Sequence, residues 1–511
     1  MGVLLNLLVL LVILTPAFRA VWDVSENTVN SPHYDDFTFT EDWLKYKEGT
    51  LTLGDLFSMH MEHRVTLPRM MAIAAHILGG SDIRWQNVYT LLLLFGMLWN
   101  LVVIWRRTTG ATLRESWLPL LLMSSVLFCA IQWQPIMWAI LFEAYVPIFA
   151  FTVILRIGTT RMNPWVGLVC NALLCVAAML SFGNGLITWM LAPFSMWFQR
   201  PDLSVRTRGS LLGAWVVVAA TALALHFCNY HNSVQPQFAY GADKQMNAMD
   251  SIKHSLGNDY TAFVVKAASF TAGVLGGHLS RGLHMQNIVL AQVMGGISIV
   301  LLLLGLGWML KNFRDTELFP KVMPWALLGL FALGTAMLIM LGRVGLTRSG
   351  SGAILPRYTC HAVPLTLALI ALAWIWGRRL LPRLPALRTL GLLTAGGLLV
   401  LSGIEWVYGE LRMELWFNAR MQGKALMTFA EVIPDKSILG QIAGDGGYCA
   451  DILQRLGKVH AAPFPLLKDL RLDNFRISSK KVLKHRLAGF DELHETKSAG
   501  TENPQQAQAP G

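Results

Sequence analysis

The chain has 511 residues, of which 54% are hydrophobic and only 14% are charged. A soluble protein carries about 25% charged residues, so this composition excludes an ordinary soluble enzyme. Lys and Arg number 42 against 31 Asp and Glu, which gives a net charge of +11. In a soluble protein this charge would favour a nucleic-acid partner, but here the basic residues lie between apolar runs, as the positive-inside bias predicts. We therefore predict an all-α polytopic membrane protein without a nucleic-acid partner.

A bilayer core about 30 Å thick is crossed by roughly 20 apolar residues in a helix. Runs of that length predict about eleven transmembrane helices. They lie at 2–21, 88–105, 117–134, 136–155, 164–182, 184–198, 209–228, 287–310, 323–341, 359–376 and 389–408. The first run lacks the basic segment and the small residue at the cleavage position that signal peptides have, which favours a retained helix over a cleaved one.

Five connections between these helices are rich in Lys and Arg, and all of them fall on one face. They cover 106–114, 156–161, 200–208, 311–321 and 378–388. The positive-inside bias makes that face cytoplasmic, with the amino terminus inside, the carboxyl terminus outside, and outer loops at 23–87, 229–286 and 342–358. The segment 263–283 is only moderately apolar, and a twelfth span would invert every helix after it. We therefore expect an interfacial or re-entrant helix there.

Residues 1–409 are predicted to form the transmembrane domain. The chain then turns polar, and 410–495 is long enough for a small extracytoplasmic α/β region, with a strand at Ser437–Ala443 and a helix at 449–457. Residues 496–511 are rich in Gln, Pro, Ala and Gly and are predicted to be disordered. The six cysteines form no CxxC pair or Cys/His cluster, so the sequence predicts neither a disulfide framework nor a zinc site.

The outer loop 23–87 is acidic, with ten acidic residues against five basic ones. Asp42–Gly49 has the pattern of a short amphipathic helix that its glycine caps. A second helical stretch is predicted to begin at Gly54-Asp55-Leu56 and to continue to Pro68. Charged groups this dense beside lipid must be solvated, paired or functional.

Two carboxylates in this loop, Asp36 and Glu62, suit general-base chemistry. One carboxylate can take a proton from an acceptor hydroxyl while the other orients the reacting group. Glu62 is followed directly by His63 and Arg64. His60 and His63 are weaker candidates, because loop histidines often form only local hydrogen bonds. The alternative is that these charges simply lie in water on juxtamembrane helices.

The outer loop 342–358 contains Arg343, Arg348 and Arg357, which break the positive-inside pattern. Glycines and serines between them let backbone N–H groups turn towards an anion, and Arg binds phosphate through two parallel hydrogen bonds. A phosphate site beside the bilayer suggests a lipid phosphate. Alternatively, these arginines pair with the acidic first loop, which would itself bring both loops to one site.

Glu143 lies well inside the predicted span 136–155 and is soon followed by Tyr145 and Pro147. An acidic group at that depth is a candidate functional residue, because a charge in the hydrocarbon layer is costly. The alternative is a buried hydrogen bond to a neighbouring helix.

The first loop resembles that of the GT-C superfamily, polytopic glycosyltransferases that take a sugar from a polyprenyl-phosphate carrier at the outer membrane face. The resemblance rests on the order of Tyr34-Asp35-Asp36, the Asp42–Gly49 helix, Gly54-Asp55 and Met61-Glu62-His63-Arg64. The chain is similar, more closely, to bacterial membrane proteins with Glu-His-Arg…Pro-Arg, Gln-Trp and Gly-Arg-x-Gly…Arg-Tyr signatures. The matching residues are Glu62-His63-Arg64, Pro68-Arg69, Gln132-Trp133, Gly342-Arg343-Val344-Gly345 and Arg357-Tyr358.

The resemblance covers 1–409 and implies a glycosyltransferase of a bacterial inner membrane, acting on an outer-face glycan, lipid or protein. Asp36 or Asp35 would be the general base, and both are eligible. Glu62 would support the base, and His63 and Arg64 would orient the pair. The residues that would hold the carrier phosphate are Arg343, Arg348, Arg357 and Tyr358.

Some members of the superfamily use a divalent cation between carboxylates and phosphate, but no ligand set in this sequence requires one. The Glu-Lys-Pro-Pro run of the aminoarabinose transferases is absent, so the identity of the sugar does not carry over. Two other functions remain open: a transporter or flippase of a lipid-linked solute, and a non-catalytic membrane subunit of a polysaccharide assembly system. A transporter predicts internal repeats and charges along a mid-membrane path, whereas only Glu143 lies well inside a span.

Overall fold

The computed structural model describes residues 2–60, 63–198, 203–228, 260–284, 287–343, 351–380, 385–430, 435–443 and 446–458. The chain divides into two units, Met1–Phe464 and Pro465–Gly511, and the second unit lies wholly outside the described residues. Several of the predictions also fall outside them: Glu62, Arg348, the tail 496–511, much of the loop 229–286, and residues 459–495 of the predicted α/β region.

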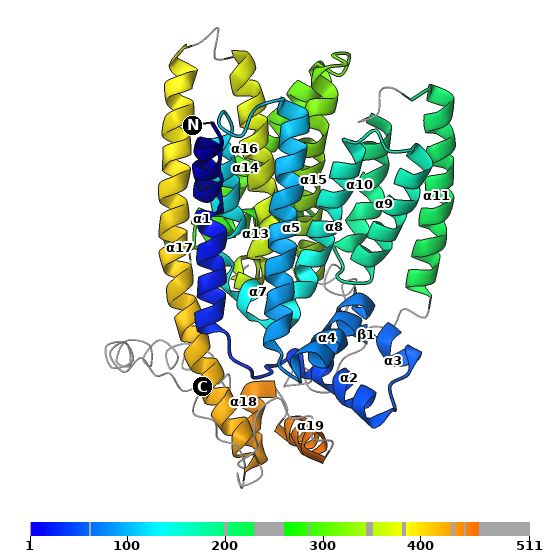
Figure 1. Ribbon diagram of the computed structural model, residues 1–511, viewed down its shortest axis with the longest axis vertical. Helices are drawn as coiled ribbons and strands as arrows, with labels where there is room; N and C mark the ends of the chain where they lie inside the picture. Colours follow the sequence, from blue (N-terminus) through cyan, green and yellow to red (C-terminus); the bar gives the residue numbers. More distant parts are fainter. Residues whose placement is uncertain are drawn as a thin grey trace, which may run out of the picture. The chain divides into compact units, whose positions relative to one another are not determined.

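Long apolar helices form the body of the first unit (Figure 1). They are α1 (Gly2–Asn27), α5 (Arg84–Thr109), α6 (Trp117–Leu127), α8 (Phe142–Gly158), α9 (Pro164–Met179), α10 (Gly185–Phe198), α11 (Val205–Phe227), α13 (Tyr260–Gly276), α14 (Ile288–Lys311), α15 (Leu318–Arg343), α16 (Thr359–Leu380) and α17 (Pro385–Thr428). Among the described residues, ten helical segments are long and apolar enough to cross a bilayer. The prediction of an all-α polytopic membrane protein is confirmed.

Short elements connect these helices. Around the first loop they are α2 (Asp36–Glu48), α3 (Leu53–Phe57), β1 (Met59–His60), β2 (His63–Arg64) and α4 (Thr66–Gly79). In the rest of the chain they are η1 (Ala130–Gln132), α7 (Trp133–Met137), η2 (Ala139–Leu141), η4 (Gly277–Leu279), η5 (Ser351–Ile354), η6 (Pro356–Tyr358), η7 (Lys436–Leu439), α18 (Gly440–Ala443) and α19 (Gly446–Lys458), where η denotes a 3-10 helix.

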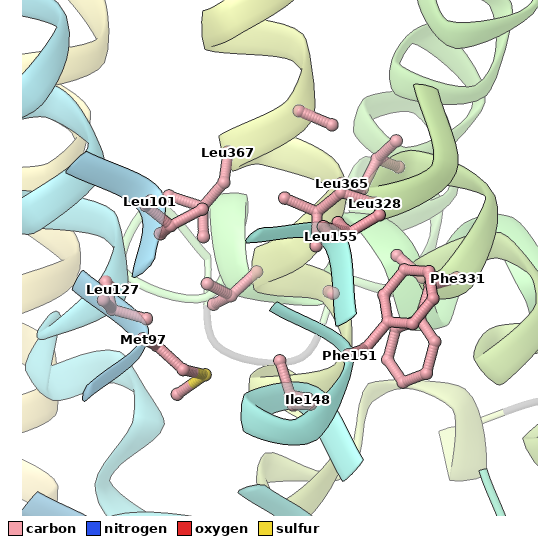
Figure 2. Close-up of a cluster of buried hydrophobic side chains, with 14 of the residues drawn as sticks. Met97, Leu101, Leu127, Ile148, Phe151, Leu155, Leu328, Phe331, Leu365 and Leu367 are labelled. Carbon is pink, nitrogen blue, oxygen red and sulfur yellow. The ribbon is translucent and has the colours of Figure 1, made fainter. Parts of the chain in front are cut away.

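Bulky side chains between the helices form the core. Figure 2 shows Phe151 of α8 against Phe331 of α15, and the two rings stack with their centroids 4.7 Å apart. Trp105 and Trp325 are fully buried and meet edge to face. By contrast, only 6% of the most apolar window of α17 is buried inside the protein. An apolar helix surface left this exposed is suited to contact with lipid.

Basic connections meet at one end of the helices, near the amino terminus of α1 (Figure 1). Arg107, in the last turn of α5, donates a hydrogen bond to Thr159 Oγ1 just after α8. Arg379 at the end of α16 forms a 2.9 Å ion pair with Asp315, between α14 and α15. Four of the five basic connections therefore gather at one end, as the positive-inside pattern requires of a single face. Which face of a membrane this is stays a prediction.

Helix α13 does not behave as the expected interfacial or re-entrant helix. It packs along α14, and Tyr260–Leu279 is long and apolar enough to be a candidate span. A Cβ atom on Gly295 of α14 would overlap the carbonyl oxygen of Ala272 in α13. Glycines give little hydropathy signal, yet they let two helices approach closely, and this explains why the sequence pattern understated α13.

The first loop lies at the opposite end of the helices, below α5 in Figure 1. Helix α2 ends at Gly49 as predicted, with φ at +72°, a conformation that glycine adopts without strain. The second helical stretch is shorter than predicted, because α3 stops at Phe57. Met59–His60 and His63–Arg64 then pair as two antiparallel strands, with His60 opposite His63.

Helix α17 continues 20 residues beyond the predicted end of its span and reaches the first loop. The predicted strand at Ser437–Ala443 is wrong, because η7 and α18 occupy these residues. Helix α19 buries an apolar face that includes Cys449, Ile452 and Leu456, and it packs on α2.

Two polar contacts fix α19 on α2. The Tyr448 hydroxyl donates to Glu41 Oε2 at 2.7 Å, and Arg455 donates through Nη2 to Glu48 Oε2, also at 2.7 Å. The backbone N–H of Tyr34 donates to the Ile442 carbonyl of α18. The last described elements, α18 and α19, are therefore joined to the first loop at α2.

Candidate functional site

Asp36 begins α2 and anchors it to the connection between α7 and α8. Its Oδ1 accepts a hydrogen bond from the Ile140 N–H at 2.9 Å, and its Oδ2 accepts one from the His33 N–H at 3.0 Å. The side chain is buried. Burial raises the pKa of Asp36 to about 7, against the opposing effects of these hydrogen bonds and the charge of Arg420. Both carboxylate oxygens already have backbone partners.

Asp35 stands in a different environment one residue earlier. Its Oδ1 is buried and has no hydrogen-bond partner in the protein. Burial raises the pKa of Asp35 to about 6, and the charges of Arg357 and Arg343 oppose that rise. The structure thus brings a carboxylate of the first loop near two arginines that come about 300 residues later in the chain. Of the two eligible aspartates, Asp35 has the free oxygen.

The two arginines come from elements that meet at this end of the helices. Arg343 is the last residue of α15, and Arg357 lies in η6. The Arg357 guanidinium lies 5.5 Å from the ring centroid of Tyr358, which is itself buried. Element η6 packs on α7, and the connection that follows α7 holds Asp36 through the Ile140 N–H.

Glu143 is a third carboxylate in the same region. It is buried in the first turn of α8, where the helix dipole favours a negative charge. Its Oε2 has no hydrogen-bond partner in the protein, and its electrostatic neighbours are Asp35, Asp36 and Arg69. The sequence singled out Glu143 for its depth alone, whereas the structure brings it to the first-loop carboxylates.

A buried ion pair joins α2 to α4. The Nε of Arg69 lies 3.3 Å from Asp42 Oδ2, and both side chains are almost fully buried. Arg69 also donates through Nη1 to the Asp55 carbonyl and to Ser58 Oγ. Burial raises the pKa of Asp42 to about 6 although Arg69 opposes the rise. In the sequence Arg69 appears only as part of the Pro68-Arg69 motif, and no local pattern there identifies Asp42 as its partner.

The hairpin residues have other partners. Arg64 donates to the carbonyls of Phe57, His226 and Cys228, so it ties α3 and the end of α11 to the hairpin. The His63 ring packs on Phe182, with centroids 4.6 Å apart. These contacts do not place either residue beside Asp36.

His60 of strand β1 is buried next to the hairpin partner His63. Burial lowers the pKa of His60 to about 3, and the neighbouring His63 and Arg69 act in the same direction. A histidine held neutral in this way does not supply a positive charge to the site.

Sequence reasoning missed the residues that α17 brings to the first loop. Trp416 packs edge to face on His33 at 5.1 Å, and Arg420 lies 5.4 Å from the Trp416 ring centroid. One signal was available: Arg412, Trp416 and Arg420 recur every four residues beyond residue 409. This helical spacing indicates that the last transmembrane helix continues past the bilayer.

The described arrangement offers a carboxylate with a buried oxygen that has no partner in the protein, two arginines that act on it electrostatically, and a further buried acid. It can take up a proton next to a site suited to an anion. Within the described ranges, no group of three or more His, Cys, Asp or Glu could hold a metal ion. Comparison with protein-family models, curated proteins and solved structures gives no match for this chain.

Proposed function

We propose that the protein is a membrane glycosyltransferase that moves a sugar from a polyprenyl-phosphate donor to an outer-face glycan, lipid or protein. The observation that carries the proposal is Asp35, a carboxylate with a buried oxygen that has no partner in the protein and with an electrostatic interaction with Arg343 and Arg357. A transferase of this kind needs a base for the acceptor and cations for the departing phosphate. These groups come from distant parts of the chain.

In this proposal Asp35 takes the proton from the acceptor hydroxyl. The acceptor oxygen bonds to the anomeric carbon of the sugar, and the bond between that carbon and the phosphate oxygen breaks. The carrier phosphate leaves with the electron pair. Arg343 and Arg357 stabilise its growing negative charge, and electrostatic stabilisation of this type is usually the largest contribution to catalysis.

Asp36 is a less suitable base than Asp35. A base must reach the hydroxyl of the acceptor within hydrogen-bond distance, whereas the two oxygens of Asp36 accept hydrogen bonds from His33 and Ile140. We infer that Asp36 fixes the start of α2 and so positions Asp35. The roles proposed for Glu62 and Arg348 stay predictions from the resemblance.

The test is transfer by the purified chain in lipid nanodiscs, with a panel of short-chain polyprenyl-phosphate monosaccharides as donors. Removal of a general base typically lowers turnover about 10²- to 10⁴-fold, so Asp35→Asn should lose that much. The matched control is Asp451→Asn, an exposed acid on α19 at the same end of the protein. Equal turnover by both variants would reject the proposal.

Arg357→Gln tests the proposed phosphate site, and the product formed separates a transferase from the two alternative functions. In a transferase it should raise the KM for the donor and lower turnover, because the phosphate loses a cation in both the bound and the reacting state. A flippase would move the lipid-linked sugar across the vesicle bilayer without forming a glycosidic product. A non-catalytic subunit would show neither activity alone.

A further inference from the structure

A small pocket that includes Asp36 in its lining lies between the first loop and α17. About 240 Å³ of empty space lies between its lining atoms, part of it open to solvent. Its lining residues are Val29, Ser31, Asp36, Ile83, Asn87, Met137, Trp138, Ala139, Trp416 and Arg420. The enclosed part of this space is small, so the pocket suits only a compact group.

Arg420 is the strongest polar group of this pocket. Its side chain is only 5% exposed, and its Nε and Nη1 have no hydrogen-bond partner in the protein. Asp36 interacts with Arg420 electrostatically, and both of its oxygens accept hydrogen bonds from backbone N–H groups. The Ser31 hydroxyl oxygen is also buried and has no partner. A buried donor left without an acceptor is costly, so these donors call for an acceptor from outside the chain.

The charges around the pocket also favour an anion. Lys424 lies one turn after Arg420 on α17 and is 8% exposed. Its charged neighbours are Arg84 and Asp82, which pair with each other beside the lining residue Ile83. Arg420, Lys424 and Arg84 thus bring three cations to this region, against the acids Asp36 and Asp82. A small anion would add to the negative charge that faces Arg420.

We propose that this pocket binds a small oxyanion, a phosphoryl or carboxylate group, through Arg420 and Ser31. Trp416 and Trp138 form its apolar walls, and Trp416 holds the guanidinium by a cation–π contact. The bound anion links the carboxyl-terminal part of α17 to the start of α2. The site is separate from Arg343 and Arg357, and it does not depend on the transferase proposal.

The test is thermal unfolding of the full chain in phosphatidylcholine nanodiscs, with inorganic phosphate or acetate titrated against chloride at constant ionic strength. Wild-type protein should show a saturable rise in Tm, because a ligand that binds only the folded state stabilises it. Arg420→Gln should lose the response. The matched control is Arg412→Gln, which removes the cation over the Trp133 ring two turns earlier on the same helix and should keep it.

Ser31→Ala is a second test of the same site, which remains available if Arg420→Gln fails to fold, because it leaves the Arg420 cation in place. Loss of one hydrogen bond should weaken the apparent affinity about fivefold. No saturable shift in the wild type, or an equal shift in Arg420→Gln, would overturn the proposal. Discs of phosphatidylglycerol identify the source: an Arg420-dependent rise in Tm without added phosphate assigns the site to a lipid headgroup, and its absence assigns it to a free anion.

Discussion

The buried pair of Arg69 and Asp42 gives the sharpest prediction for stability. At a separation of 3.3 Å and an effective dielectric constant of about 20, the attraction is about 5 kcal/mol. Arg69→Gln removes that attraction and leaves the carboxylate buried. Breaking a buried pair in this way costs about 3–5 kcal/mol.

Protonation of Asp42 limits the loss. The pKa of Asp42 is already raised to about 6 by burial, and without Arg69 it rises further. At a pH between the pKa of Asp42 in the wild type and its higher pKa in the variant, Asp42 is protonated in the folded variant but not in the folded wild type. The free energy of unfolding of the variant therefore falls further below that of the wild type as the pH rises. We expect a deficit of about 3 kcal/mol at pH 8 and a smaller one at pH 5.

The assay is reversible unfolding in mixed micelles, followed by circular dichroism at both pH values. Arg84→Gln is the control, because its ion pair with Asp82 is partly exposed and should change stability by at most about 1 kcal/mol. Asp42→Asn combined with Arg69→Gln should recover part of the loss. A deficit below about 1 kcal/mol at pH 8, or one that does not depend on pH, would refute this reasoning.

Gly295→Ala should destabilise the protein by about 1–3 kcal/mol, because the new methyl group overlaps the Ala272 carbonyl, whereas Gly296→Ala has open space and should be neutral or stabilising; thermal unfolding of both variants checks this. If Asp35 is the base, turnover should rise about tenfold between pH 5 and 7 with a midpoint near its pKa of about 6, and a flat pH profile would count against it. A cysteine at the exposed Leu53 should react with an impermeant reagent from the outer face of intact cells, and labelling only after lysis would reverse the predicted orientation.

Hydropathy and turn chemistry predicted most of the membrane fold. Runs of about 20 apolar residues mark helices because backbone groups in lipid must be satisfied internally, and Gly49 marked the end of α2 correctly. The hairpin at Met59–Arg64 was missed because two-residue strands have no readable period. The packing of α13 on α14 was missed because it depends on close contacts at glycines such as Gly276 and Gly295, and a hydropathy scan does not register such contacts.

The candidate site was predictable in its composition but not in its assignments. Asp35 of the first loop interacts electrostatically with Arg343 and Arg357 of the late loop, whereas the roles of these residues stay predictions. The choice between Asp35 and Asp36 depends on the N–H of Ile140, a partner 104 residues away. No local pattern encodes such a contact, because it arises only when the helices pack.

The attachment of α19 to α2 sets a time order for biosynthesis. Glu48 and Arg455 are 407 residues apart in sequence, and at about 5–20 residues per second the ribosome needs roughly 20–80 s to make that stretch. During this interval α2 lacks the contacts that α19 makes with Glu41 and Glu48. The end of the helices that carries the first loop therefore stays incomplete until α19 has been made, and truncation before α19 should leave that end open to protease.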